Sequence, residues 1–372
     1  RFDVIAEDDM TTVSVRMGEG TAYGQNASNT VDVGKSCSAT GTNLDNFQCT
    51  TLGVALDDFE SWSLDRDKVA GTVSTQYISP DTIGYEDLGN YGSWTQDQQY
   101  GPVWYPNNVA TDWAPYQDGQ WIWLGFWGWT WVDNQPWGFA PFHYGRWAHL
   151  RNRWCWVPGP IGAHPLYAPA LTVFIGGNKP QFMINGGYGI GWFPLAPGEP
   201  YIPSYYVNHN YFIAINQSNT VIDVAFINNI YKNQNMIINY RNARIANAVT
   251  VVPSDDFINS RIVNNLRLHV PDQILFNAGK THVAPIVPRA ISILGGKAFT
   301  QVKPSAEIIS RPIITKTQPS SATPSFSQVH PFLLKNAGRP LTPAEVQNIN
   351  TGKPAIIKQS PPVTVHPVPG QT

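Results

Sequence analysis

Polar and apolar residues alternate along residues 1–42, as in "MTTVSVRMGEGTAYG" and "NTVDVGKSCSA". A period of two is typical of strands with one buried face, and Gly18, Gly20 and Gly24 mark turns between the strands. This segment therefore predicts short antiparallel strands joined by hairpins. Its first strand, at "RFDV", has no partner upstream, so we expect further strands of the same domain to precede Arg1 in the full protein.

The sequence of residues 43–98 predicts a connector made of a helix and turns. The stretch "DDFESWSLDRDKV" begins with two acidic residues, which favour a helix N-terminus, and it places Phe59 and Trp62 on one face. The stretch "YISPDTIGYEDLGNYGSW" then carries the chain by turns into a region rich in tryptophan.

Residues 99–203 contain an internal duplication. The segment "WAPYQDGQWIWLGFWGWTWV" (113–132) aligns with "FAPFHYGRWAHLRNRWCWVP" (139–158), and "WFPLAPG" (192–198) is a weaker copy of the same motif. Each copy predicts an Ala-Pro turn followed by a β-hairpin. Because a hairpin cannot bury a face alone, the copies must pack together, which predicts a small antiparallel β domain.

The tryptophans of this region fit a core better than a binding surface. Of the 14 tryptophans, 12 lie between Trp94 and Trp156, in a stretch with few other large apolar residues. A domain of this composition cannot expose most of its indoles and still fold. The expected core residues are Trp113, Trp121, Trp129, Trp131, Trp147, Trp154 and Trp156. The residues that we consider for an exposed binding platform are Trp137, Phe142, Tyr144 and Trp147.

Residues 204–283 form an asparagine-rich segment. The stretches "YFIAINQSNTVIDVAFI" and "NMIINY" keep a strand-like alternation, so we expect strands whose amides pair with another surface. Two short helices should follow, one capped by Ser254 and the other, "PDQILFNAG", ending at Gly279.

Residues 284–372 are rich in proline and predict an extended tail. Within it, residues 343–351 predict a short helix, with Thr342 as N-cap and Glu345 completing a capping box. Apolar clusters such as "HPFLLKNAG" and "PAIIK" suggest anchors that bind a groove or a sheet edge, on the same chain or on a neighbour. The alternative is a simple spacer.

Composition and charge narrow the classes of partner and compartment. Only 13% of residues are charged and the formal net charge is −2, without the clustered basic face that nucleic-acid binding requires. No apolar run approaches the roughly 18 residues of a membrane-spanning helix. A low-charge chain dense in turns suits an oxidising compartment, so we predict a disulfide between Cys37 and Cys49, the alternative being two unpaired thiols. Cys155 reads as a small buried hydrophobe.

Candidate chemistry is sparse. A glycosidase needs two carboxylates in one cleft, and the acids of the tryptophan-rich region are Asp112, Asp118, Asp133 and Glu199. Asp118 and Asp133 occupy turn positions, which indicates solvated acids. The histidines, His143, His149, His164 and His209, lack metal-ligand spacing. We therefore predict no catalytic, cofactor-binding or metal-binding residues.

The motifs of this chain also carry a family resemblance. The stretches "YISPDTIGYEDLGNYGSW", "YGPVWYP", "WAPYQDGQWIW", "GWTWVDNQPWGFAPFHYGRW" and "WVPG" resemble a Trp/Gly/Pro-rich domain of unknown function that secreted bacterial proteins carry behind a FecR-like β domain. Residues 1–42 resemble the closing strands of that FecR-like domain. The resemblance covers roughly residues 1–265. It implies a protein of the periplasm, the outer-membrane surface or the extracellular space of a Gram-negative bacterium, and it implies no established activity.

Three classes of function remain. The first is a non-catalytic structural or interaction component of the cell envelope or of an extracellular assembly, whose partners are other envelope or filament proteins or copies of itself. The second is a module that binds glycan or peptidoglycan through exposed aromatic residues. The third, an enzyme, has no supporting constellation of residues.

Overall fold

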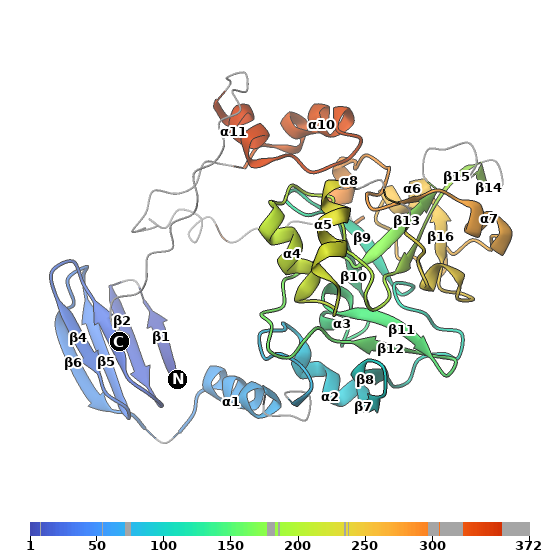
Figure 1. Ribbon diagram of the computed structural model, residues 1–372. Coiled ribbons are helices and arrows are strands. Elements are labelled where there is room, and N and C mark those ends of the chain that lie inside the picture. Colours follow the sequence, from blue (N-terminus) through green and yellow to red (C-terminus); the bar gives the residue numbers. More distant parts are fainter. Residues whose placement is uncertain are drawn as a thin grey trace. The chain divides into compact units, whose positions relative to one another are not determined.

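The chain contains two compact units, Arg1–Thr72 and Val73–Thr372, which are described separately (Figure 1). The computed structural model describes residues 1–7, 9–53, 55–70, 76–176, 183–184, 187–233, 236, 238–296, 305 and 323–351. Antiparallel strands dominate both units, as the alternating pattern predicted, and the helices are short. None of the described helices has the length and apolarity needed to cross a bilayer.

The first unit is an antiparallel sheet with a separate two-stranded hairpin. The sheet has the order β1-β2-β5-β6, and β3 pairs with β4. The strands are β1 (Phe2–Ala6), β2 (Met10–Val15), β3 (Gly20–Tyr23), β4 (Ser28–Val31), β5 (Lys35–Thr40) and β6 (Asp45–Thr51). The strands expected before residue 43 are present. Strand β6 was not expected, because its sequence, "DNFQCTT", is mostly polar. Its residues are mostly exposed, as suits a strand at the edge of a sheet.

The core of the first unit is small. Its buried apolar residues are Val15, Val31 and Cys37, with Val13 and Phe47 packed against them. Cys37 lies directly opposite Cys49 in the β5–β6 ladder, and the two form the predicted disulfide. The bond supplements a hydrophobic core that is small for a unit of this length.

Helix α1 (Asp58–Ala70) confirms the helix predicted after the first strands. The guanidinium of Arg16 forms a bidentate pair with the carboxylate of Glu60, and it also donates to the carbonyls of Gly53 and Ala55, each at 3.1 Å. The Arg16 guanidinium holds the pKa of Glu60 below its usual value. These contacts attach the start of α1 to the end of β2.

Thiol labelling tests the cysteine assignment. Cys155 is buried, and burial raises the pKa of its thiol to about 12, so the reactive thiolate is scarce at neutral pH. We expect no labelling of the native protein by iodoacetamide and one labelled cysteine after unfolding without reductant. Reductant should raise the count to three. Three labelled cysteines in the unreduced, unfolded protein would contradict the bridge.

The second unit is built on four antiparallel hairpins. Strands β11, β12, β8 and β7 form one sheet in that order, β9 and β10 form a second, and a third contains β14-β15-β13-β17 with β16 paired to β15. The hairpin strands are β7 (Gly92–Asp97), β8 (Gly101–Pro106), β9 (Gly119–Leu124), β10 (Gly128–Asp133), β11 (Arg146–Leu150), β12 (Arg153–Val157), β13 (Thr172–Gly176) and β15 (Gly187–Pro194). The remaining strands are β14 (Met183–Ile184), β16 (Thr250–Pro253) and β17 (Lys280–Thr281).

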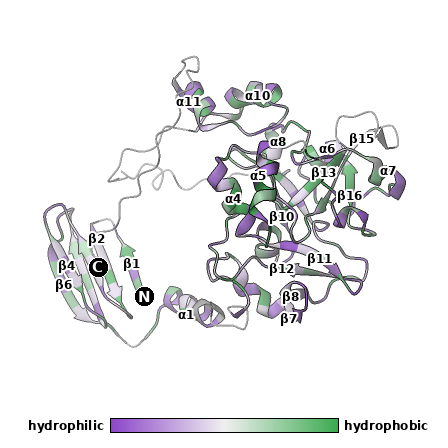
Figure 2. Ribbon diagram, in the orientation of Figure 1, coloured by the Kyte–Doolittle hydropathy of each residue, from purple (hydrophilic) through white to green (hydrophobic). Residues whose placement is uncertain are grey.

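Short helices connect and cover these sheets. They are η2 (Tyr85–Asp87), α2 (Leu88–Tyr91), α3 (Ala140–His143), α4 (His209–Gln217), α5 (Val224–Lys232), η4 (Asn242–Arg244), α6 (Ser254–Ile258), α7 (Asp272–Asn277) and α8 (Ala290–Ile293). Figure 2 shows that β13 and β16, two strands of the third sheet, are largely hydrophobic. They lie on either side of β15, which buries its last six residues.

The strands expected over the asparagine-rich segment are wrong. The stretch "YFIAINQSNTVIDVAFI" instead contains α4 and the start of α5, and the described residues of "NMIINY" form no strand. Asn208 and Asp223 accept hydrogen bonds from backbone amides three residues on, which begins each helix. Phe212 and Ile215 are buried three residues apart on one helix face. The predicted helices α6 and α7 are present, but Ser254 does not cap α6.

The described part of the proline-rich segment is folded rather than extended. Helix α11 (Pro343–Thr351) has the predicted bounds, and Thr342 and Glu345 exchange the hydrogen bonds of the capping box. Helix α10 (Phe326–Lys335) was not expected, because the proline-rich composition predicted an extended segment, and it forms with Pro331 inside it. The predicted anchor "PAIIK" lies outside the described residues.

Candidate functional site

The four hairpins of the second unit are copies of one structural motif. In each, an aromatic residue on the first strand lies opposite a tryptophan on the second. The pairs are Trp94 with Trp104, Trp121 with Trp131, Trp147 with Trp156, and Phe174 with Trp192. The first members follow one another at intervals of 27, 26 and 27 residues. The internal duplication seen in the sequence includes the second and third copies and only part of the fourth.

The first copy, which was not predicted from the sequence, shares a glycine two residues before the aromatic residue of its first strand. Gly92, Gly119 and Gly145 share this place, and a Cβ atom at each would lie within 2.2–2.6 Å of the indole of Trp104, Trp131 or Trp156, respectively. Each indole therefore covers the glycine backbone of the neighbouring strand, and a larger residue would displace it. The repeated Gly-x-Trp spacing was visible in the sequence and is the signal for this motif.

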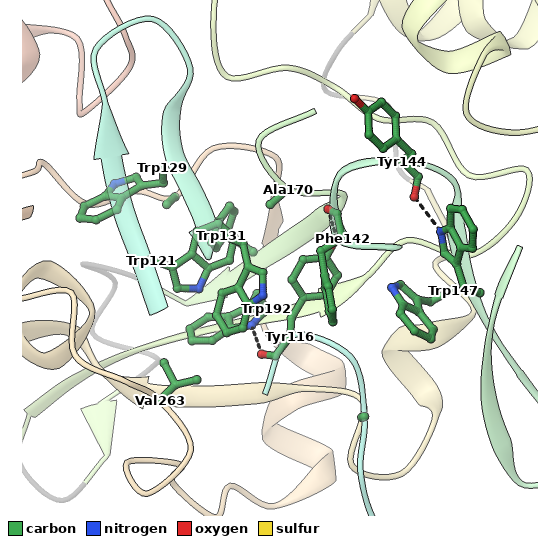
Figure 3. Packing of buried hydrophobic residues seen from close by; sticks show 14 of the residues in the cluster. Tyr116, Trp121, Trp129, Trp131, Phe142, Tyr144, Trp147, Ala170, Trp192 and Val263 are labelled. Carbon is green, nitrogen blue, oxygen red and sulfur yellow. Dashed lines mark hydrogen bonds between the residues drawn. The ribbon is translucent and has the colours of Figure 1, made fainter. Parts of the chain in front are cut away.

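The paired aromatic residues meet in one core (Figure 3). The ring of Trp121 contacts the edges of Trp131 and Trp192, with centroid distances of 5.5 Å in both cases, and Tyr116 contacts Trp131 at 5.6 Å. The Trp192 indole donates to the Tyr116 carbonyl at 2.9 Å. Edge-to-face packing of this kind fixes the rings relative to one another.

Six of the seven expected core tryptophans are buried. These six are Trp121, Trp129, Trp131, Trp147, Trp154 and Trp156. Trp113 is half-buried, with its ring against those of Trp137 and Trp147.

The residues considered for an exposed binding platform point inward. Trp137, Phe142, Tyr144 and Trp147 are each at most 3% exposed, so the expected surface row is wrong. The short helix α3 folds this stretch onto the core, where Trp137 stacks on Phe142 at 5.8 Å. Their tryptophan-rich sequence context could not distinguish a surface from a core.

A buried polar network joins the asparagine-rich helices to the hairpins. Arg146 is fully buried, and its guanidinium donates to the carbonyls of Gly145 and Glu199 at 2.8–3.1 Å. Burial lowers the pKa of Arg146 to about 10 and raises that of the Glu199 carboxyl. The Glu199 carboxylate accepts the backbone amides of Ala196 and Arg241 at 2.8 and 2.7 Å. The guanidinium also donates to the side-chain oxygen of Asn216 in α4 at 3.4 Å, so backbone carbonyls and an amide, rather than an opposing carboxylate, satisfy the buried arginine.

Two asparagines extend this network. Asn219 accepts from the Gly145 amide at 2.9 Å and donates to the Leu166 carbonyl at 2.8 Å. Asn242 donates to the carbonyls of Trp147 and Pro194 at 2.8 and 3.0 Å. These two side-chain amides therefore bond to backbone groups of the second unit. Asn219 lies in the turn after α4 and Asn242 begins η4, whereas the sequence predicted that asparagines on strands would make such pairs.

Removing one of these amides should destabilise the second unit. In Asn219→Ala, the Gly145 amide and the Leu166 carbonyl lose a partner in a buried site, so we expect a loss of about 2–3 kcal/mol in the free energy of unfolding. The matched control is Asn229→Ala, at an exposed position of α5, with a change below about 0.5 kcal/mol. Urea denaturation followed by tryptophan fluorescence compares the two. Equal effects would show that the buried amide has no special role.

Two of the acidic residues lie close together, because Gln135 donates hydrogen bonds to the carboxylates of both Asp118 and Asp133. Asp118 accepts hydrogen bonds from Asn134 and Gln135 at the base of the β9–β10 hairpin. Asp133, expected to be solvated, is instead half-buried beside the Trp131 indole, and burial raises its pKa to about 8. Asp112 lines an open cleft without either of them.

The histidines occupy separate environments. His143 is buried against the Ala168 carbonyl, and burial lowers its pKa to about 4. His149 lines the cleft, His164 pairs with Asp81, and His209 contacts Asn228. Within the described ranges, no group of three or more His, Cys, Asp or Glu side chains is placed to hold a metal ion.

The cleft beside Asp112 is the site best suited to a polar ligand in the tryptophan-rich region. It has a volume of about 680 Å³. Trp113, His149 and Trp154 form its aromatic wall, and the rings of His149 and Trp154 lie 5.1 Å apart. Hydrogen-bonding side chains surround them, namely Asn107, Asn108, Asp112, Asn152, Arg153 and Asn247. Three separate loops supply these residues, so the sequence alone did not bring them together.

The C-terminal segment covers a different face of the same hairpins. The indole of Trp129 donates to the Ile286 carbonyl at 3.1 Å. Leu333 of α10 and Leu341, before α11, are buried in the main core, and Pro340 lies against Gly128 in the turn of the β9–β10 hairpin. The described anchors therefore bind their own chain.

Comparison with known proteins adds one family match. Residues 85–199, which contain all four hairpins, match a family of unknown function (DUF6600). No curated protein matches the chain. No solved structure matches it either.

Proposed function

We propose that this chain is a non-catalytic interaction component of a bacterial cell envelope or of an extracellular assembly. The observation that carries the proposal is the open edge of β1. In the part of the chain that the structure describes, no strand pairs with the outer edge of β1. Phe2, Val4 and Ile5 are 65%, 50% and 46% exposed, respectively, and Figure 2 shows this hydrophobic edge in green.

An apolar edge strand is a ready template for another strand. Phe2 and Val4 lie opposite Val15 and Val13, so they extend the apolar face whose buried part ends at β2. A partner strand that pairs with β1 would complete the backbone ladder and cover these side chains. The partner proposed here is a strand of another envelope or filament protein, or of a second copy of this chain. Strands of the same domain, which the sequence led us to expect before Arg1, would cover the same edge, and finding them there is the result that contradicts this partner.

The compartment belongs to the same proposal. The Cys37–Cys49 disulfide suits an oxidising location such as the periplasm, the outer-membrane surface or the extracellular space. The first unit is proposed to correspond to the closing strands of a FecR-like domain, on the resemblance of residues 1–42 and the order of its sheet. In this proposal, strand pairing at β1 attaches the chain to its partner, and the second unit is attached through the first.

The test is a charge placed on the edge strand. Val4→Lys keeps the strand but puts an ammonium group on the face that a partner would cover, so it should reduce co-isolation of the partner from chemically cross-linked cells by at least about tenfold. The control is Thr50→Lys, at an exposed position of the opposite edge strand β6. Equal recovery with both variants would contradict attachment through β1.

A second candidate function is glycan binding in the cleft beside Trp113. The observation that favours it is the combination of an aromatic wall with exposed amides and a carboxylate, the groups that contact sugar rings and hydroxyls. Calorimetric titration with soluble peptidoglycan fragments should then show binding that Asn107→Ala and Asp112→Ala weaken about tenfold and Asn229→Ala does not. Absence of binding, or binding unchanged in the cleft variants, would exclude this function.

A further inference from the structure

A second cavity, with a lining distinct from that of the cleft, has a strongly one-sided charge. It has a volume of about 630 Å³ and is bordered by η4, β17, the end of α7 and the turn between α10 and α11. Among the residues that the structure describes, the charged side chains that line it are Arg244, Lys280 and Arg339, with no carboxylate. Three cations therefore face one partly enclosed space.

These cations lack neutralising partners. Among the described residues, none of the three forms an ion pair with Asp or Glu. Burial, followed by the positive charge of Arg244, lowers the pKa of Lys280, whose ammonium group donates to the Phe276 carbonyl at 3.3 Å. Like charges that line one cavity repel each other, and a bound anion would relieve that repulsion.

The rest of the cavity wall supplies neutral groups. The hydroxyl of Tyr240 lies 3.3 Å from Nε2 of His282, and burial lowers the pKa of His282 to about 4, so this imidazole is neutral at pH 7. Ile202, Ile238 and Val283 form apolar walls. The cavity thus combines cations with a neutral polar pair and an apolar lining, which suits a molecule with an anionic head and an apolar portion.

We propose that this cavity binds a phosphate-bearing ligand, with Arg244, Lys280 and Arg339 as its charge partners. Guanidinium groups match phosphate oxygens in pairs, and the ammonium group adds a compact charge. Arg339 follows α10, whereas Arg244 and Lys280 belong to η4 and β17. Bound phosphate would therefore also fasten the C-terminal segment to the third sheet. This inference does not depend on the role of β1.

Phosphate chemistry has two sources here, a free small molecule and a lipid headgroup, and two probes distinguish them. Pyrophosphate is titrated calorimetrically into the full chain at constant ionic strength, and sedimentation measures binding to vesicles of phosphatidylglycerol against vesicles of phosphatidylcholine. Binding of pyrophosphate alone indicates a free phosphate ligand, and binding to the phosphatidylglycerol vesicles indicates a headgroup. Binding of neither probe overturns the proposal.

Substitutions assign the binding to the cavity. Lys280→Gln and Arg339→Gln should each weaken binding at least about tenfold, because each removes a charge-assisted contact. Both side chains are exposed enough for the unliganded variants to keep the wild-type melting temperature, which is checked first. Lys232→Gln, at the exposed end of α5, is the control and should bind as the wild type does. Unchanged binding in the cavity variants, or equal weakening in the control, overturns the proposal.

Discussion

Replacing Trp131 by Ala should lower the free energy of unfolding of the second unit by about 3–5 kcal/mol. Trp131 is fully buried, and its ring contacts those of Tyr116, Trp121 and Trp192. Its loss leaves a cavity among rigid rings that cannot close around it. It also removes the indole N–H that donates to the half-buried Asp133 carboxylate at 2.9 Å, so among the described residues this carboxylate keeps only the Gln135 amide as a donor.

Urea denaturation of Trp131→Ala beside Phe126→Ala measures this effect. Phe126 lies between the two strands of the same hairpin and is 67% exposed, so its replacement should change the free energy of unfolding by less than about 0.5 kcal/mol. If Trp131→Ala lowers the free energy of unfolding by less than about 1 kcal/mol, the edge-to-face aromatic contacts do not hold the hairpins together.

Ending the chain after residue 283 should lower the free energy of unfolding of the second unit by at least about 4 kcal/mol. Among the buried side chains that the shortened protein lacks are the large apolar ones of Ile286, Leu333 and Leu341, each of which contributes about 1.5–3 kcal/mol by burial. It also loses the Ile286 carbonyl that accepts from Trp129. The exposed indole should shift the tryptophan fluorescence to longer wavelength.

The control is a chain that ends at residue 351, which retains both C-terminal helices. Its denaturation midpoint and emission spectrum should match those of the full chain. If the chain ending at 283 is equally stable, the C-terminal segment is a spacer, and its buried contacts do not contribute to the fold.

The sequence predicted those elements whose signals are local. Alternation gave the strands before residue 43, and the capping box gave α11 with its bounds. The Trp-x-Trp pairs gave the second and third hairpins. The first hairpin was missed although Gly92 and Trp94 repeat the spacing, and the fourth was obscured because Phe174 replaces tryptophan and β13 and β15 are far apart in the chain.

Elements whose stability depends on tertiary contacts were not predictable in this way. The stretch around Phe212 and Ile215 fits a strand or a helix by pattern alone, and the bonds of Asn219 to the backbone near Gly145 and Leu166 exist only in the folded chain. The proline content of residues 284–372 predicted an extended tail, yet α10 forms around Pro331 with Leu333 buried in the core. Tertiary packing outweighs local preference in both places.

The candidate sites depend on distant segments even more strongly. The aromatic and amide cleft combines loops near Asn107, Asn152 and Asn247, and the cationic cavity combines residues from η4 to the turn after α10. No spacing in the sequence links these positions. The exposed platform predicted for Trp137 and its neighbours is wrong because it also depends on tertiary structure. The sequence of an aromatic-rich stretch is the same whether the stretch faces water or a core.

Site-specific photo-cross-linking from position 4 tests the interaction role most directly. A photoreactive phenylalanine analogue replaces Val4 in cells that produce the full chain, and the same analogue replaces Thr50 on the opposite edge as a control. The account predicts a discrete cross-linked product between position 4 and another envelope protein or a second copy, and none from position 50. No product from position 4, or the same products from both positions, would contradict attachment through the edge of β1.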